Sequence, residues 1–285
     1  MAVLNSILNL SKEMVEWRRH LHTIPELGLK EFKTSEFISN KLKEWNIQHE
    51  CKMAETGIVA TIKGKKGNSS KSIGLRADID ALPIEEKNDF NHKSKHKGIS
   101  HKCGHDGHTT LLLGAAKHLS ENQDFNGTVH LIFQPAEEGI GGADIMINEG
   151  LFKKYPMDMV YGMHNWPELP IGQFSVCNGP IMAAANTIQI KIKGKGGHAA
   201  MPHQTIDPII IASNIVNSLQ TISSRNIDPL DSIVLSITQF HSGTTHNIIP
   251  DEVFLEGSLR TLNNKTKEYA YNKIKDISNN ISKGF

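Results

Sequence analysis

The sequence predicts an α/β fold, with a mixed sheet and flanking helices over residues 1–182 and a smaller ferredoxin-like domain over residues 183–285. Three observations predict this fold. Helical and strand-like segments alternate in the first part of the chain. The strand-like segments are largely apolar, which is typical of a sheet covered on both faces. From about residue 185 the order of segments changes to β-α-β-β-α.

The elements of the first part follow from apolar spacing and from breaker residues. Apolar side chains recur at helical spacing in the first two segments, and Pro25 and Gly28 interrupt the chain between them. The next two segments are rich in β-branched residues and are separated by the turn-like stretch "KKGNSSK". The expected elements are helices over 3–22 and 30–46, strands over 56–64 and 72–80, a helix over 108–120, a strand over 127–135, a helix over 142–152 and a strand over 157–165.

The second part begins with a cleanly alternating strand at residues 186–194 and an amphipathic helix at 207–225. Two strands at 231–243 and 252–262 and a helix at 265–284 follow. This order is one strand short of the β-α-β-β-α-β pattern, in which four strands form one sheet under two helices. We therefore expect the domain to lack its last strand.

Composition excludes several classes of function. The chain has 31 Lys and Arg against 30 Asp and Glu, a net charge of +1, which gives no reason to expect nucleic acid or an anionic membrane as partner. No apolar stretch reaches the roughly 18 residues that a membrane span needs, and the N-terminus lacks the pattern of a secretory signal. Three scattered cysteines are too few for a disulfide framework, so we expect a cytoplasmic protein.

Acids and a histidine stand directly after the apolar strands. Asp78 and Asp80 end one strand, Glu137 and Glu138 follow the next, and His164 follows a third. Because polar residues at the carboxyl ends of strands line the site in such folds, these side chains are the candidate functional residues.

The stretch "SHKCGHDGHTT" at residues 100–110 has three interpretations. Cys103 and His105 suit a metal site, since thiolate and imidazole both bind zinc-like or manganese-like ions. A cysteine–histidine nucleophile pair or a polar helix start with Asp106 in its first turn are the alternatives. The adjacent carboxylates in "FQPAEEG" favour the metal, because two neighbouring acids repel each other unless a positive charge lies close. One glutamate would then be a ligand, and the other would take a proton from metal-bound water.

Seven blocks of the sequence together resemble a known family. They are "RRHLHTIPELG", "GLRADIDALP", "HKCGHDGHTT", "FQPAEEG", "MHNWP", "GKGGHAAMPH" and "HNIIPDEVFLEGSLRTL". In this order they resemble the signature blocks of the aminoacylase/carboxypeptidase-like metallohydrolases. The closest branch contains hippurate hydrolase, bacterial N-acyl-amino-acid amidohydrolases and plant auxin-conjugate hydrolases. The resemblance runs from about residue 10 to the end of the chain.

The resemblance implies a centre of two divalent metal ions, such as manganese, zinc, cobalt or nickel. Its ligands would be Cys103, His105, Glu138 and His164, with the thiolate bridging. Glu137 would be the general base, and Asp80 would be the aspartate that orients a ligand histidine. Asp78 stands where relatives outside this branch keep a metal-binding histidine, so its role here stays open. His101 and His108 are left unassigned.

For residues 183–285 the resemblance implies an inserted lid and dimerisation domain, and hence a homodimer. His198, Asn247 and Arg260 match residues that contact the polar end of the substrate. An arginine suits a carboxylate, and His or Asn can stabilise a developing oxyanion. The alternatives are that Asn247 caps a turn and that Arg260 is an edge-strand charge.

The expected function is therefore metal-dependent hydrolysis of the amide bond of small N-acyl amino acids, with hippurate-like substrates as the first choice. Family members continue beyond the point where this sequence stops, return to the catalytic domain and supply one more metal-ligating histidine. We accordingly expect a C-terminally shortened chain. The alternatives are a carboxypeptidase or dipeptidase on the same scaffold, or a truncated, non-catalytic remnant that only dimerises.

Overall fold

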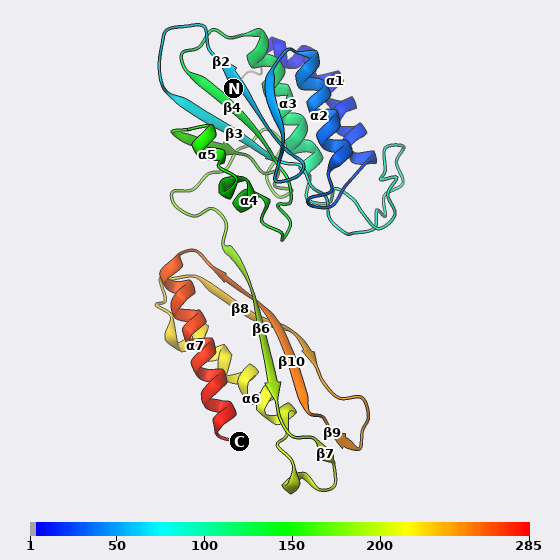
Figure 1. Ribbon diagram of the computed structural model, residues 1–285, viewed down its shortest axis with the longest axis vertical. Coiled ribbons are helices and arrows are strands. Elements are labelled where there is room, and N and C mark those ends of the chain that lie inside the picture. Colours follow the sequence, from blue (N-terminus) through cyan, green and yellow to red (C-terminus); the bar gives the residue numbers. More distant parts are fainter. Residues whose placement is uncertain (1–3) are drawn as a thin grey trace. The chain divides into compact units, whose positions relative to one another are not determined.

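The computed structural model describes residues 4–285, and its contacts divide the chain into two compact units, one ending at Pro170 and one spanning Ile171–Phe285 (Figure 1). The sequence prediction places the boundary between residues 182 and 183. Residues 171–182, which lie between these two boundaries, belong to no helix or strand. The predicted start of the first helix at residue 3 lies outside the described residues.

The first unit is an α/β structure built around a five-stranded sheet. Its helices are α1 (Asn5–Thr23), α2 (Phe32–Glu44), α3 (His105–Glu121), α4 (Gly142–Asn148) and α5 (Leu151–Lys154). Its strands are β1 (Gln48–Met53), β2 (Gly57–Lys63), β3 (Ser72–Asp78), β4 (Thr128–Gln134) and β5 (Met159–Gly162).

The sheet is mixed, as the sequence predicts, with the strand order β1-β2-β4-β3-β5. Strands β1, β2 and β4 pair antiparallel, whereas β3 runs parallel to both β4 and β5. The carboxyl ends of β3, β4 and β5 therefore meet at one edge of the sheet. Strand β1 was not predicted, because its sequence "QHECKM" is polar and exposed at the sheet edge.

Helices cover both faces of this sheet (Figure 1). Alternate residues of β2 and β4 point to opposite sides, because side chains of a strand alternate between the faces. Ile58 and Phe133 lie in the core formed with α1, α2 and α3. Val59 and Ile132 pack on the other face, in a smaller core with Met146 of α4. The sheet is thus anchored from both sides, and its strand ends are held at fixed positions.

The second unit has a three-stranded antiparallel sheet in the order β6-β10-β8, with α6 and α7 on one face (Figure 1). Its core is formed mainly by isoleucines and leucines from both helices and all three strands. The elements are β6 (Ala184–Lys193), β7 (Gly197–His198), a 3-10 turn (Pro202–Gln204), α6 (Pro208–Thr221), a π-helical turn (Ile222–Asn226), β8 (Ile233–His241), β9 (Ile248–Ile249), β10 (Glu252–Thr261) and α7 (Asn264–Lys283). This is the predicted β-α-β-β-α order, with a short β7–β9 pair added.

Among the described residues, no helix combines the length and the apolar character that crossing a membrane would require.

Candidate metal centre

The candidate residues of the first unit gather at the shared carboxyl edge of β3, β4 and β5. Asp78 of β3 lies opposite Gln134 of β4 in the parallel register, so the segments after both strands leave the sheet side by side. These segments carry Asp80 and the pair Glu137–Glu138. His164 follows β5, two residues after its end. The residues that the strand-end pattern singles out therefore lie at the same end of the sheet.

A glycine shapes the segment that brings Cys103 and His105 to this edge. Gly104 precedes the first residue of α3 and has φ +92° and ψ +17°, a left-handed conformation that L-residues other than glycine rarely adopt. A Cβ at this position would lie 2.3 Å from Oδ1 of Asn165. The glycine therefore lets the chain turn sharply between the two candidate ligands while the segment after β5 packs against it.

One ring nitrogen of His105 is held and the other is left free. Its Nδ1 is 2.9 Å from the backbone oxygen of Asp80 and 3.2 Å from Oδ1 of the same residue, so Nδ1 carries the proton and donates to them. Its Nε2 is buried and has no hydrogen-bond partner among residues 4–285. Burial by itself would lower the pKa of His105, but the hydrogen bond to Asp80 and the charge of Asp78 raise it overall. An imidazole oriented in this way by a carboxylate is typical of a metal ligand.

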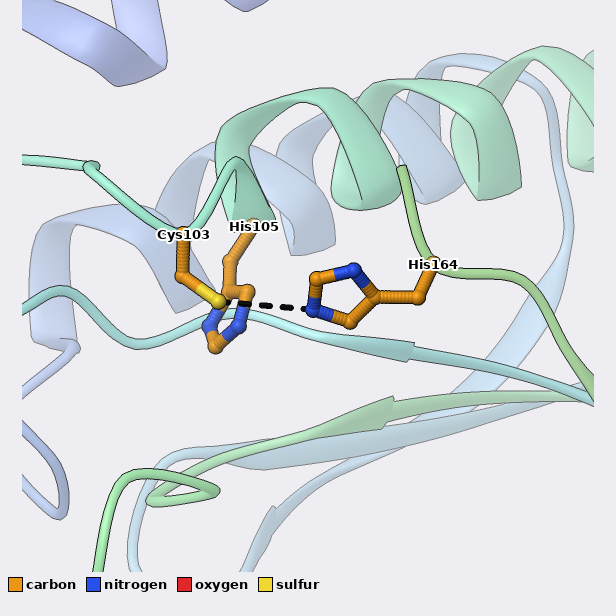
Figure 2. Close-up of side chains that lie close together, drawn as sticks. All are labelled: Cys103, His105 and His164. Atoms are coloured by element: carbon orange, nitrogen blue, oxygen red, sulfur yellow. Dashed lines mark hydrogen bonds between the residues drawn. The ribbon is translucent and has the colours of Figure 1, made fainter. Parts of the chain in front are cut away.

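Cys103 and His164 complete a cluster with His105, as Figure 2 shows. The Sγ of Cys103 lies 3.3 Å from Nε2 of His164. The Nδ1 of His164 donates to the backbone oxygen of Asn165 at 2.7 Å, so Nε2 is the nitrogen that faces the cluster. One ligand atom from each of the three residues lies within 4.8 Å of the others.

The surroundings of Cys103 call for a cation. Burial raises the pKa of its thiol to about 12, and the carboxylates of Glu138, Asp78 and Glu137 contribute to that rise. A nucleophilic cysteine needs the opposite, a lowered pKa, so this environment argues against a cysteine–histidine nucleophile pair. A divalent cation would offset the carboxylates and favour the thiolate.

Glu137 and Glu138 lie on the turn after β4 and form a second candidate group with His105. The backbone N–H of Glu138 donates to Oδ2 of Asp80 at 2.9 Å. Burial and the neighbouring charge of Glu138 both raise the pKa of Glu137. A carboxylate with a raised pKa is suited to accept and return a proton near neutral pH. Thiol, imidazole and carboxylate groups are together the donors that zinc-like and manganese-like ions prefer, so the residues present fit a metal.

Asp78 and His108 form a further candidate group with His105, but their ligand atoms are already used. The Nε2 of His108 accepts from the backbone N–H of Asn165 at 3.0 Å, so Nδ1 carries the proton and donates to Oδ1 of Asp78 at 2.6 Å. The other oxygen of Asp78 pairs with Arg76 at 2.8 Å. The sequence reasoning missed this link between β3 and the segment after β5. Its signal was the spacing of His105 and His108, three residues apart on one helix.

Two other polar residues of the 100–110 stretch, Asp106 and His101, are buried beside these groups. Asp106, in the first turn of α3, accepts hydrogen bonds from His22 at 2.9 Å and from Arg18 at 3.4 Å. His101 is buried, neither of its ring nitrogens has a partner in the described chain, and burial lowers its pKa to about 4.

In the second unit, two of the three predicted substrate residues lie close together. His198 in β7 pairs with Ile248 in β9, directly after Asn247. The backbone oxygen of Asn247 accepts from the N–H of Ala199 at 3.1 Å. Arg260 is exposed near the far end of β10, where its Nε donates to the Ser258 hydroxyl at 3.2 Å. Within this unit the three residues do not form one cluster, and their role in substrate binding stays a prediction.

Comparison with known proteins shows what the chain as a whole is similar to. Residues 74–273 match the profile of peptidase family M20/M25/M40. The chain is 45% identical over 281 residues to the N-acetyl-L-cysteine deacetylase of Bacillus subtilis, covering 98% of this chain and 67% of that protein. It is 44% identical over 282 residues to the hippurate hydrolase of Campylobacter jejuni, covering 99% of this chain and 73% of that one. Among solved structures, a dinuclear metal-binding peptidase of the M20 family from Bacillus subtilis superposes with a TM-score of 0.82 at 35% identity, covering 98% of this chain and 72% of that chain.

Proposed function

The chain belongs to peptidase family M20/M25/M40, whose members are metal-dependent hydrolases, and on that premise we propose that it hydrolyses the amide bond of N-acyl amino acids, with hippurate-like compounds as preferred substrates. Two divalent ions, from among manganese, zinc, cobalt and nickel, are its proposed cofactors. The deacetylase and the hippurate hydrolase that it resembles support this choice of substrate class by their names.

The observation that carries the proposal is the buried Nε2 of His105, which has no hydrogen-bond partner among residues 4–285. His105 belongs to two groups of candidate donors, one with Cys103 and His164 and the other with Glu137 and Glu138. We assign Cys103, His105, Glu138 and His164 as metal ligands. The chemistry that ions bound there would supply is polarisation of the amide carbonyl and acidification of a water molecule.

The chain's own groups would then move the protons. Glu137 accepts a proton from the attacking water at its carboxylate and later donates it to the nitrogen of the leaving amine. Its raised pKa suits both steps, since the group must gain and lose a proton at the same pH. Asp80 holds Nδ1 of His105 and the backbone N–H of Glu138, which keeps two of the proposed ligands in place.

For the second unit we propose the role of lid and dimerisation domain in a cytoplasmic homodimer. His198 and Asn247 would contact the polar end of the substrate, and Arg260 would bind its carboxylate. The proximity of the His198 and Asn247 segments across the β7–β9 pair supports a common role for these two.

The test is a hydrolysis assay on the full chain purified with Mn²⁺ or Zn²⁺. N-benzoyl and N-acetyl amino acids are compared with dipeptides, and release of the free amino acid is measured. Glu137→Gln should lower kcat by about 10²- to 10⁴-fold, the usual contribution of a general base. The matched control is Glu36→Gln, because Glu36 is exposed on α2, outside the cluster.

The outcomes separate the alternatives. Faster turnover of dipeptides than of acylated amino acids would replace the proposal with a dipeptidase or carboxypeptidase. A well-folded chain that binds metal but cleaves neither class would favour the non-catalytic alternative. Unchanged activity in Glu137→Gln would remove Glu137 as the base.

A further inference from the structure

The turn that carries the proposed base has an unusual backbone. Ala136, directly before Glu137, has φ +50°, in the left-handed region that alanine seldom occupies. A residue in such a conformation persists where surrounding contacts hold it, and such residues cluster at functional sites. The contacts that hold Ala136 therefore also determine the direction in which Glu137 leaves the chain.

Two buried carboxylates hold this turn by its backbone N–H groups. Oε1 of Glu31 accepts from the N–H of Ala136 at 2.8 Å, and Oδ2 of Asp80 accepts from the N–H of Glu138 at 2.9 Å. Both acids are 0% exposed. A hydrogen bond to an ionised carboxylate is shorter and roughly twice as strong as one between neutral groups, so each is a firm anchor. Glu137 lies between the two anchored positions.

Glu31 is itself fixed, although it forms no ion pair with a described residue. It directly precedes α2, 105 residues before Ala136 in the sequence, and its Oε2 accepts from the Thr56 hydroxyl at 2.6 Å. Burial raises the pKa of Glu31, which reflects the cost of placing a carboxylate there. Packing of the core does not require a charged side chain at this position. The hydrogen bond from the N–H of Ala136 does require an acceptor there.

The turn is closely packed by its neighbours. The oxygen of Ala136 accepts from the N–H of Gly142 at 2.9 Å, so both polar groups of Ala136 are bonded. A Cβ at Gly142 would lie 1.9 Å from the oxygen of Pro135, and one at Gly28 would lie 2.9 Å from Cβ of Ala136. The glycines leave room for this conformation of the turn, and Glu31 fixes it.

We propose that Glu31 is a positioning residue for the hydrolytic reaction: its carboxylate holds Ala136 in the left-handed conformation and thereby aims the Glu137 side chain at the reacting atoms. Glu31 touches neither substrate nor candidate ligand and acts through the backbone alone. This inference rests on the proposed role of Glu137 as the base.

The decisive variant is Glu31→Leu, which has a similar volume and removes both acceptors. Because misplacing a reacting group by about 1 Å can cost about 10²-fold in rate, kcat should fall by about 10- to 100-fold. KM and the metal content per chain should stay at the wild-type values. Glu31→Gln keeps a carbonyl that can accept from Ala136, so it should recover kcat to within about threefold of the wild type. Where leucine prevents folding, Glu31→Asp keeps the charge but withdraws the carboxylate by one methylene, and a loss of kcat is again expected.

The matched control is Glu26→Leu. Glu26 lies in the same segment and also accepts from backbone N–H groups, at Lys33 and Thr34, but within the described part of the chain its carboxylate forms no hydrogen bond with the turn after β4. It should leave kcat unchanged. A second measurement does not depend on activity: in the metal-free chain, hydrogen exchange of the amides of residues 136 to 138 should be faster in Glu31→Leu than in wild type or in Glu26→Leu.

Failure of this inference is distinguishable from failure of the proposed function. Wild-type kcat in Glu31→Leu or Glu31→Asp, alongside an inactive Glu137→Gln, would overturn the role of Glu31 and leave the base in place. Unchanged exchange of the turn amides would overturn it as well. An active Glu137→Gln would instead refute the base itself, whatever the exchange data show for the turn.

Discussion

Replacement of Gly104 by alanine should weaken metal binding by more than its cost in stability explains. Alanine at φ +92° carries the left-handed penalty of about 1–2 kcal/mol. The new Cβ would also lie 2.3 Å from Oδ1 and 2.9 Å from Cγ of Asn165, so that side chain has to move. The backbone oxygen of the same residue accepts from Nδ1 of His164, so a movement of Asn165 that extends to its backbone disturbs the orientation of a proposed ligand. Loss of such a supporting contact typically costs about 10- to 100-fold in metal affinity.

Gly150 provides the matched control. It precedes α5 with φ +94° and ψ +27°, nearly the conformation of Gly104. The nearest atom to a Cβ added at Gly150 would be Cβ of Lys153, at 3.9 Å. Urea unfolding in the presence of a chelator should show a similar loss of stability for Gly104→Ala and Gly150→Ala. Competition with a chromophoric chelator for Zn²⁺ should show weaker binding for Gly104→Ala alone. The reasoning is refuted if the two variants bind zinc equally well.

Two further predictions concern pH and metal removal. Burial would raise the pKa of Asp78, but its hydrogen bond from His108 and the charge of Arg76 outweigh burial and lower it from 3.8 to about 2, equivalent to about 2 kcal/mol. A carboxyl whose pKa is lower in the folded than in the unfolded state stabilises the fold at every pH above its unfolded pKa. The metal-free wild type should therefore lose this stability as the pH falls from about 4 to 2. Asp78→Asn should be less stable than wild type at pH 7, and its free energy of unfolding should change less between pH 4 and 2. If urea unfolding shows the same pH dependence of that free energy in both proteins, the assignment is contradicted. For metal removal, a free metal concentration of 100 times Kd stabilises the fold by about 2.7 kcal/mol. A chelator should therefore lower the thermal midpoint of metal-loaded wild type, and Cys103→Ser should shrink that shift; an equal shift in both would exclude Cys103 as a ligand.

The fold was largely predictable because the buried elements have clear patterns. The structure contains the strands predicted from apolar runs, which are β2, β3 and β4. It also contains the helices predicted from amphipathic segments, which are α1, α2, α6 and α7. The predicted helix over residues 142–152 is two helices, α4 and α5, separated by Gly150 in a left-handed conformation. Strand β1 escaped prediction because an edge strand with exposed side chains shows no apolar pattern.

The candidate site was predictable to the extent that its residues follow strands. Parallel pairing of β3 with β4 and β5 brings the strand-end acids and His164 together, which the strand-end rule anticipates. Glu31 lies outside that rule, since it precedes a helix and reaches the turn only through tertiary packing. Nothing in the sequence distinguishes Glu31 from a glutamate on the surface. Its complete burial is visible only in the structure.

The first residues of α3 leave little room for change in chain length during divergence. His105 faces the cluster, Asp106 faces α1, and His108 bonds to Asp78. An inserted or deleted residue would rotate everything beyond it by about 100° around the helix axis. Each side chain beyond the change would then point away from its present partner. A change in length is therefore expected before Cys103 or beyond the end of the helix.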